Sequence, residues 1–225
     1  MIFEPIIHIL FMLVIFTVIR IRVIAGANTA IWLLIGLTCF FTARNIYQRG
    51  MEAVNANQAL FAYRQVLPVD PVVVRSALET LLGILVTILL LLGAAIYDLP
   101  IIPWNPAQVL FAFLGMCLCG LGLSLTLSVA STLVSELGRL ISILFTPLYF
   151  LSGVVFPVSL VPVQYREWLF LNPFAHGLEL LRGGYFPVYH VAPEANFLYL
   201  YGFAIALICL GLMLQVRYSS LLRAQ

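Results

Sequence analysis

The sequence is divided into apolar runs that are long enough to cross a lipid bilayer. Six such runs occupy approximately residues 6–25, 30–47, 72–97, 107–134, 140–156 and 197–216. A bilayer core about 30 Å thick needs roughly 20 apolar residues for each helical crossing, and helices satisfy their own backbone where water is absent. We therefore predict an all-α integral membrane protein, a single domain of six transmembrane helices over residues 1–225.

The composition excludes a water-soluble fold. Hydrophobic residues make up 63% of the 225 residues and charged residues 9%, whereas about a quarter of the residues of a soluble domain are charged. The formal net charge is only +2 and the arginines are scattered, so no basic surface for nucleic acid is expected. The four cysteines all lie in apolar runs and are interpreted as packing residues, not as a disulfide or metal site.

All 11 basic residues are arginines, because the sequence contains no lysine. A phosphate-binding loop of the Walker type requires a lysine, so this chain cannot hold ATP in that way. No nucleophile, base and orienting group stand out, and we predict no catalytic residue, metal or cofactor in this chain. The rival interpretations are a membrane enzyme and a channel or ion-coupled carrier, to which Glu79 and Glu136 near the ends of runs give little support.

Three pairs of residues mark expected helix starts, each with a capping side chain before a proline: Asp70–Pro71, Asn105–Pro106 and Asn172–Pro173. Within the fourth run, Gly120, Ser124 and Ser128 recur every four residues. A stripe of small residues lets helix backbones approach closely in lipid. We expect this stripe to mark a contact between helices.

The arginines favour one orientation in the membrane. With the N-terminus in the cytoplasm, the predicted crossings place six arginines inside: Arg49, Arg64, Arg75, Arg139, Arg217 and Arg223. Four lie outside: Arg20, Arg22, Arg166 and Arg182. Since basic residues concentrate in cytoplasmic loops, we predict that both termini are cytoplasmic.

Residues 48–71, between the second and third runs, differ from a simple connection. Leu60, Arg64 and Leu67 recur at spacings of four and three, with Phe61 and Tyr63 beside them, as is typical of a short interfacial helix. Aromatic residues and arginine often anchor protein interfaces, so this helix could dock on a soluble partner. The alternative is a helix that lies on the membrane surface without a partner.

Residues 157–193 are too polar for a crossing and too apolar for an ordinary loop. We predict two short helices here, one over about 162–170 with Tyr165 and Trp168 on one side, the other from Asn172 to the glycine pair at 183–184. The second has an apolar face and a polar face: Phe174, Leu178, Leu181 and Tyr185 against His176, Glu179 and Arg182. This amphipathic hairpin either enters the outer leaflet as an aromatic belt or lines the mouth of a pathway.

Arg44 is an ionisable residue inside the second run, about one helical turn from its end. Such a group is costly in lipid unless it faces protein or water. Two interpretations follow. Arg44 contacts an anionic group of a substrate, or its side chain simply extends to the membrane interface.

Four stretches resemble the ABC-2 permeases that export capsular polysaccharide, the KpsM group. They are residues 52–70 with the element Phe61-Ala-Tyr-Arg-Gln65, the opening Glu4-Pro5-Ile-Ile-His8, Leu151-Ser-Gly-Val-Val-Phe-Pro157, and Asn172-Pro-Phe-Ala-His-Gly-Leu-Glu-Leu-Leu-Arg182. The likeness covers nearly the whole chain. The first element is fairly specific to the capsule group, whereas the Ser-Gly and Asn-Pro elements recur in ABC-2 exporters of O-antigen, teichoic acid and drugs.

The resemblance implies a homodimeric permease in the bacterial inner membrane, paired with two copies of a separate KpsT-like ATPase that binds ATP and magnesium. It would pass a lipid-linked acidic polysaccharide to a KpsE-like periplasmic protein of the co-polymerase type and an outer-membrane exporter. By this resemblance, the coupling helix that contacts the ATPase would contain Leu60, Phe61, Tyr63, Arg64 and Gln65. The periplasmic gate and sugar path would be formed by Tyr165, Trp168, Phe174, Arg182 and Tyr185. Arg44 is the candidate contact for the charge of the substrate.

The beginning of the chain departs from the family pattern. Members of this group usually carry an amphipathic cytoplasmic segment before the Glu-Pro pair, whereas only three residues precede Glu4 here. We expect either that the native start lies upstream or that this segment is missing.

Overall fold

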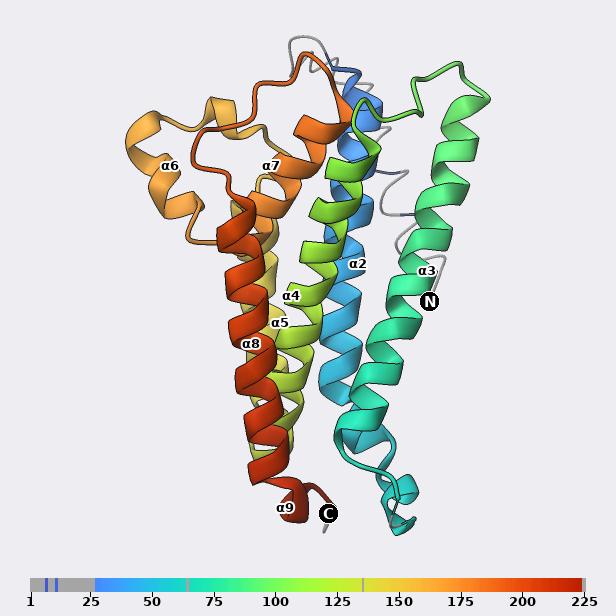
Figure 1. Ribbon diagram of the computed structural model, residues 1–225, viewed down its shortest axis with the longest axis vertical. Helices are drawn as coiled ribbons and strands as arrows, with labels where there is room; N and C mark the ends of the chain where they lie inside the picture. Colours follow the sequence, from blue (N-terminus) through green and yellow to red (C-terminus); the bar gives the residue numbers. More distant parts are fainter. Residues whose placement is uncertain (1–6, 8–10, 12–26, 64, 135, 224–225) are drawn as a thin grey trace.

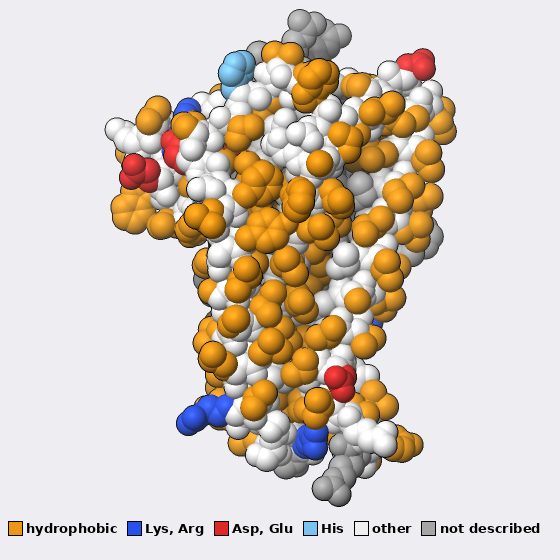
Figure 2. All heavy atoms as spheres, in the orientation of Figure 1, with side chains coloured by type: hydrophobic (Ala, Val, Ile, Leu, Met, Phe, Trp, Pro, Cys, Tyr) orange, Lys and Arg blue, Asp and Glu red, His pale blue; other side chains and the backbone are white. Residues whose placement is uncertain are grey.

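The computed structural model describes residues 7, 11, 27–63, 65–134 and 136–223, and the described chain is helical, without strands. Four helices run side by side along the long axis of the molecule (Figure 1). Each is long and apolar enough to cross a membrane: α2 (Thr29–Ala56), α3 (Val69–Ala95), α4 (Pro106–Leu133) and α8 (Phe197–Arg217). Figure 2 shows hydrophobic side chains over the middle of the molecule and most charged ones toward its ends, as expected in a bilayer.

These four helices correspond to four of the six predicted crossings. The predicted first crossing, residues 6–25, lies almost wholly outside the described residues. The predicted fifth crossing, residues 140–156, corresponds to α5 (Leu137–Leu151), whose 15 residues fall short of the roughly 20 that a straight crossing needs. An all-α architecture with membrane-length helices is therefore confirmed for the described chain, and the number of six crossings stays a prediction.

The two Asn-Pro pairs begin helices as predicted. Asn105 precedes α4 and Asn172 precedes α7, and each side chain accepts a backbone N–H of the first turn at 3.1 Å. The prediction that Asp70 is an N-cap is wrong, because α3 already begins at Val69. The preceding proline has helical backbone angles, and Asp70 instead accepts the N–H of Leu67 at 2.7 Å from inside the first turn.

The remaining helices are short, and most of them lie at the two ends of the bundle (Figure 1). Near the end where α2 begins lie a 3-10 helix, η2 (Val158–Leu160), and two α-helices, α6 (Val163–Leu169) and α7 (Pro173–Tyr185). At the opposite end, with the C-terminus, lie η1 (Gln58–Ala62) and α9 (Ser219–Arg223). The two short helices predicted between residues 157 and 193 are thus present, at nearly the predicted bounds.

Helix α2 is the centre of the bundle. The buried share of its most apolar stretch is 78%, against 50% for α4 and 17% for both α3 and α8. Its side chains build the core, with Trp32, Leu37 and Phe40 almost fully buried. Helices α3, α4 and α7 pack on α2. Most of this stretch of α2 is therefore enclosed by protein, whereas α3 and α8 turn most of their surface outward.

The small-residue stripe of α4 forms the predicted helix contact. A Cβ atom at Gly120 would lie 2.9 Å from the carbonyl oxygen of Ala43 on α2. Nearby, a Cβ atom at Gly50 of α2 would overlap the side chain of Ser124. Ser128 lies farther along the stripe, and its hydroxyl accepts a hydrogen bond from a glutamine of α8 at 2.8 Å. The stripe therefore lets the α2 and α4 backbones approach closely and provides a polar link to α8.

We predict that Gly120→Ala destabilises the folded protein by about 1–3 kcal/mol, the usual cost of overpacking a tight contact. The new methyl group would press against the backbone of α2, which cannot move aside as a flexible side chain can. Gly93→Ala is the matched control, because a Cβ atom there meets no atom within 4 Å. Melting temperatures in detergent decide the point, and equal effects of the two substitutions would contradict the tight contact.

Candidate functional site

Helix α7 carries an imidazole, a carboxyl and a guanidinium side chain, and all three are buried. The exposed fractions are 3% for His176, 2% for Glu179 and 0% for Arg182. The sequence indicates an amphipathic helix with one free polar face, but both faces of α7 are covered. The reason is that α7 packs among α2, α4 and α8, so its polar side chains need partners inside the protein.

Arg182 joins three parts of the chain. Its Nη1 and Nη2 atoms donate hydrogen bonds to the carbonyl oxygens of Gly153 and Val154, at 2.7 and 2.8 Å. Its guanidinium carbon lies 3.3 Å from the ring centroid of Trp32 on α2, a cation–π contact. Gly153 has a φ of +70°, which favours glycine and turns the two carbonyls after α5 toward the arginine. Burial lowers the pKa of Arg182 to about 10, so the side chain stays cationic at neutral pH.

Glu179 holds the segment that follows α7. Its carboxylate accepts hydrogen bonds from the Tyr189 hydroxyl at 2.9 Å and from the Ala192 N–H at 3.2 Å. Burial raises the pKa of this carboxyl, while the charge of Arg182 and the two hydrogen bonds lower it in part. Glu179 therefore fixes residues 186–196 against α7.

His176 links α6, α7 and the start of α8 in a single neutral tautomer. Its Nε2–H donates to the carbonyl oxygen of Phe170 at 2.7 Å, because a carbonyl can only accept. Its Nδ1 accepts the N–H of Asn196, the N-cap of α8, at 2.9 Å. The ring of Tyr199 stacks on the imidazole at 4.4 Å. A proton on Nδ1 would face the Asn196 N–H and break this arrangement.

The aromatic residues predicted for an exit path do not lie together. Phe174 packs edge-on against a phenylalanine of α2, and Tyr185 donates to the carbonyl oxygen of Ile101 at 2.7 Å, so both rings are buried. Tyr165 and Trp168 on α6 are 57% and 74% exposed. Among the described residues of the predicted set, the α6 aromatics are thus the ones open to a ligand. Their role in a sugar path stays a prediction.

At the other end of the bundle, the short interfacial helix predicted over residues 60–67 is not present. The structure has instead the five-residue 3-10 helix η1, and Tyr63 after it is extended, with φ −84° and ψ 115°. The spacing of three and four residues is therefore not sufficient to form a helix here, and Pro68 disfavours helical angles only at Leu67, the last residue of the pattern. Contacts between neighbouring residues hold this loop together, and it has no amphipathic helical face.

The predicted coupling residues lie in this loop with different exposures. Leu60 and Tyr63 are 44% and 69% exposed, and Gln65 is also exposed. Phe61 is half-buried against a core cluster from α2, α3, α4 and α9. Arg64 lies outside the described residues. Phe61 therefore attaches the loop to the bundle while its neighbours face outward.

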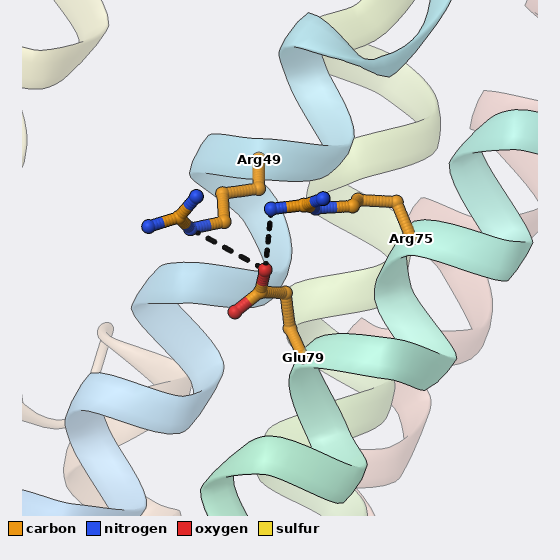
Figure 3. Close-up of polar contacts among 3 residues, drawn as sticks. All are labelled: Arg49, Arg75 and Glu79. Atoms are coloured by element: carbon orange, nitrogen blue, oxygen red, sulfur yellow. Dashed lines mark ion pairs between the residues drawn. The ribbon is translucent and has the colours of Figure 1, made fainter. Parts of the chain in front are cut away.

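Three charged side chains meet between α2 and α3 (Figure 3). Glu79 Oε1 of α3 lies 2.8 Å from an Nη of Arg75 and 3.3 Å from Nε of Arg49 on α2. The carboxylate is buried, and both arginine side chains are about a quarter exposed, at 27% and 28%. The ion pair joins the two helices that flank the loop. From the sequence Glu79 was a candidate only for an ion relay, although its four-residue spacing from Arg75 is typical of an ion pair on one helix.

Arg44, the predicted contact for substrate charge, is half-buried. Its guanidinium carbon lies 5.7 Å from the ring centroid of Phe41, one turn earlier on α2. The ring stabilises the cation locally. Contact with a substrate stays a prediction.

A cavity of about 230 Å³ lies among α2, α3, α4 and α7. Its lining is almost wholly apolar and includes Ile35, Ile88, Phe113 and Leu181. A sugar here would lose its hydrogen bonds to water without replacement, so this cavity does not suit a glycan. Within the described ranges, no group of three His, Cys, Asp or Glu residues is placed to hold a metal ion.

Residues 1–186 match the family model described as ABC-2 type transporter. The chain is 34% identical over 213 residues to the polysialic acid transport protein KpsM of Escherichia coli, an alignment that covers 95% of this chain and 82% of that protein. It is 26% identical over 216 residues to the capsule polysaccharide export inner-membrane protein CtrC of Neisseria meningitidis serogroup A, covering 96% and 81%. It is also 26% identical over 220 residues to BexB of Haemophilus influenzae, a protein of the same description, covering 96% and 81%.

We predict that His176 makes stability depend on pH. Burial lowers the pKa of His176 from its ordinary 6.5, so the folded protein keeps the ring neutral where the unfolded chain takes up a proton. The stability from this ring is therefore complete above about pH 6.5 and is lost as the pH falls toward the folded value. The raised pKa of Glu179 makes its own contribution to stability increase as the pH falls. The pH dependence of wild-type stability alone therefore does not isolate the effect of His176.

The comparison with His176→Gln isolates the effect. The difference in melting temperature between wild type and this variant should shrink between about pH 7.5 and pH 5, because only the wild type loses the neutral ring. His190→Gln removes an exposed histidine of the same segment and controls for the loss of a histidine as such. A constant difference across this range would contradict the neutral tautomer.

Proposed function

This chain belongs to the ABC-2 type transporter family, and from that premise we propose that it is the permease subunit of an ATP-driven exporter of capsular polysaccharide. The observation that carries the proposal is the likeness, over nearly the whole chain, to a polysialic acid transport protein. The relatives CtrC and BexB, named for capsule polysaccharide export, favour the same substrate class. The alternative is an ABC-2 permease for O-antigen, teichoic acid or a drug.

ATP hydrolysis belongs to a separate subunit in this proposal. The chain has no lysine and hence no Walker loop. Two copies of an ATPase, each with ATP and magnesium, would act on a homodimer of this permease. Both termini and the loop around η1 would face the cytoplasm, where the ATPase is. Acidic polysaccharide on a lipid carrier would leave toward periplasmic and outer-membrane partners.

The loop at residues 57–68 is the proposed contact with the ATPase. Leu60 and Tyr63 are exposed there, and Phe61 packs on the bundle. The Arg49–Glu79 ion pair joins α2 and α3 about two turns into α2 and three turns into α3 from the loop. A displacement of the loop would therefore move both helices together instead of spreading them apart. This arrangement supports mechanical coupling between ATP hydrolysis and the bundle.

The opposite end of the bundle is the proposed exit. Trp168 and Tyr165 are exposed on α6, which projects from the side of the bundle (Figure 1). Aromatic rings can stack on the apolar faces of successive sugars without fixing one hydrogen-bonding register. The buried network of α7 would hold α6 in place.

Deletion of the gene in its own host tests the function. We predict that surface capsule is lost while polysaccharide accumulates inside the cell. A plasmid copy should restore the surface polymer. Normal surface capsule would contradict the proposal, and loss of O-antigen with intact capsule would favour the alternative substrate.

The loop contact has its own test in the assembled permease–ATPase complex. We predict that Tyr63→Ala lowers export about tenfold, the loss expected for an anchor at an interface, without lowering the amount of folded permease. Tyr97→Ala is the matched control, because Tyr97 is 79% exposed and lies in the connection after α3, at the other end of that helix. Export and ATP hydrolysis are measured together. Unchanged export in Tyr63→Ala, or an equal loss in Tyr97→Ala, would exclude a specific role for the loop.

A further inference from the structure

The apolar cavity among α2, α3, α4 and α7 lies at membrane depth. Its lining on α3 runs from Ile84 to Leu91, and its lining on α4 runs from Pro106 to Phe113. Ile84 lies eleven residues before the end of α3 at Ala95, about 16 Å along the helix axis. That length is about half of the roughly 30 Å hydrocarbon core of a bilayer. The cavity therefore lies within one leaflet, at the end of the bundle where α2 begins.

Aromatic side chains mark the membrane surface at that end. Tyr97 and Trp104 lie in the connection between α3 and α4 and are 79% and 72% exposed. Exposed tyrosine and tryptophan collect at the level of the lipid headgroups. The cavity begins beside Pro103 and Pro106, next to this level, and extends from there along the helices. A phospholipid with its headgroup near these rings has its acyl chains at the depth of the cavity.

The hydroxyl groups of the lining already have partners. Thr38 and Thr87 donate to carbonyl oxygens of their own helices, at 3.2 and 2.8 Å, and Tyr185 donates to the α3–α4 connection at 2.7 Å. The thiol of Cys39 is only a weak hydrogen-bonding group. A buried water needs about two to four polar partners, and cavities without them stay dry. The lining therefore suits hydrocarbon and not water.

In the described chain, the cavity is continuous with the surface that α3 and α4 turn outward. Helix α3 packs mainly on α2 and contacts α4 much less. Three residues that line the cavity, Ile84, Ile88 and Leu110, are 38%, 49% and 57% exposed. Figure 2 shows hydrophobic side chains over α3 and α4 at this level. Hydrocarbon can therefore enter from the bilayer without crossing a polar surface.

We propose that this cavity binds one fatty acyl chain of a bilayer phospholipid, inserted between α3 and α4. An apolar cavity of about 150 Å³ is large enough for benzene, so the volume of about 230 Å³ holds a segment of a longer chain. The chain supplies the dispersion contacts that the lining side chains lack on their open side. The lipid is held by its acyl chain, so binding does not depend on the charge of the headgroup or on the exported polymer.

The test is photocrosslinking of the full chain in nanodiscs, with phosphatidylcholine that carries a diazirine within one acyl chain. Peptide mass spectrometry then locates the adducts. We expect adducts on Ile35 and Cys39, which line the cavity and are only 5% and 2% exposed, so that lipid on the outer surface does not reach them. Leu37 is equally buried on the same helix but does not line the cavity, and it should carry none. Phosphatidylglycerol with the same labelled chain should give the same adducts.

Val109→Phe fills the cavity from the side of α4. We expect most of the adducts on Ile35 and Cys39 to be lost, because the ring takes the space of the acyl chain. Val216→Phe is the matched control, the same substitution at a 73% exposed residue of α8, and it should keep the adducts. Ile88→Phe fills the cavity from α3 and replaces Val109→Phe if that variant does not fold.

Three outcomes would overturn the proposal. The first is a wild-type protein without adducts on Ile35 and Cys39, a result that needs no variant. The second is an undiminished yield of these adducts in a folded cavity-filling variant, or an equal loss in Val216→Phe. The third is adducts from labelled phosphatidylglycerol but not from labelled phosphatidylcholine, which would show that the headgroup and not the acyl chain determines binding.

Discussion

The close approach of helices around α2 is the constraint on which the rest of the structure depends. In lipid, apolar side chains gain little by leaving one apolar environment for another, so helices associate through tight packing and hydrogen bonds. Gly50 and Gly120 remove the side chains that would separate α2 from α4, and the Ser76 and Ser124 hydroxyls bond at 3.1 Å where α3 joins them. With α2 so enclosed, α3 and α8 form the lipid-facing surface and α7 packs on the remaining side.

Because α2 is enclosed, the charged residues that pack against it need partners inside the protein. These partners differ between the two ends of α2. At one end Arg182 donates to two carbonyl oxygens and lies over the Trp32 ring, without a carboxylate within ion-pair distance among the described residues. At the other end a buried carboxylate, Glu79, is shared by two arginines that reach the surface. The first arrangement joins α2 to α7, and the second joins α2 to α3.

Sequence patterns predicted the features that depend on neighbouring residues. Four of the predicted crossings correspond to membrane-length helices, and Asn105 and Asn172 cap helices as predicted, because both are local signals. The sequence did not predict that both faces of α7 are buried. Its alternating polar and apolar faces indicate a surface helix, whereas His176 and Arg182 have partners at Asn196 and at the 153–154 turn, distant in sequence. The 3-10 helix η1 and the extended Tyr63 were also not predicted, because the spacing of apolar residues does not specify the backbone angles between them.

The same contacts limit where a polysaccharide can pass. A sliding glycan needs polar groups that exchange partners easily, yet the polar side chains of α7 are occupied inside the chain by short hydrogen bonds. The cavity among α2, α3, α4 and α7 is apolar and would strip the sugar of its hydrogen bonds. Neither of these two regions of the described chain therefore suits a sliding glycan. The exposed aromatics of α6 lie on the surface of the chain, and a path along that surface needs a second copy to enclose it. Such a path agrees with the proposed homodimer and leaves the contacts of α7 intact.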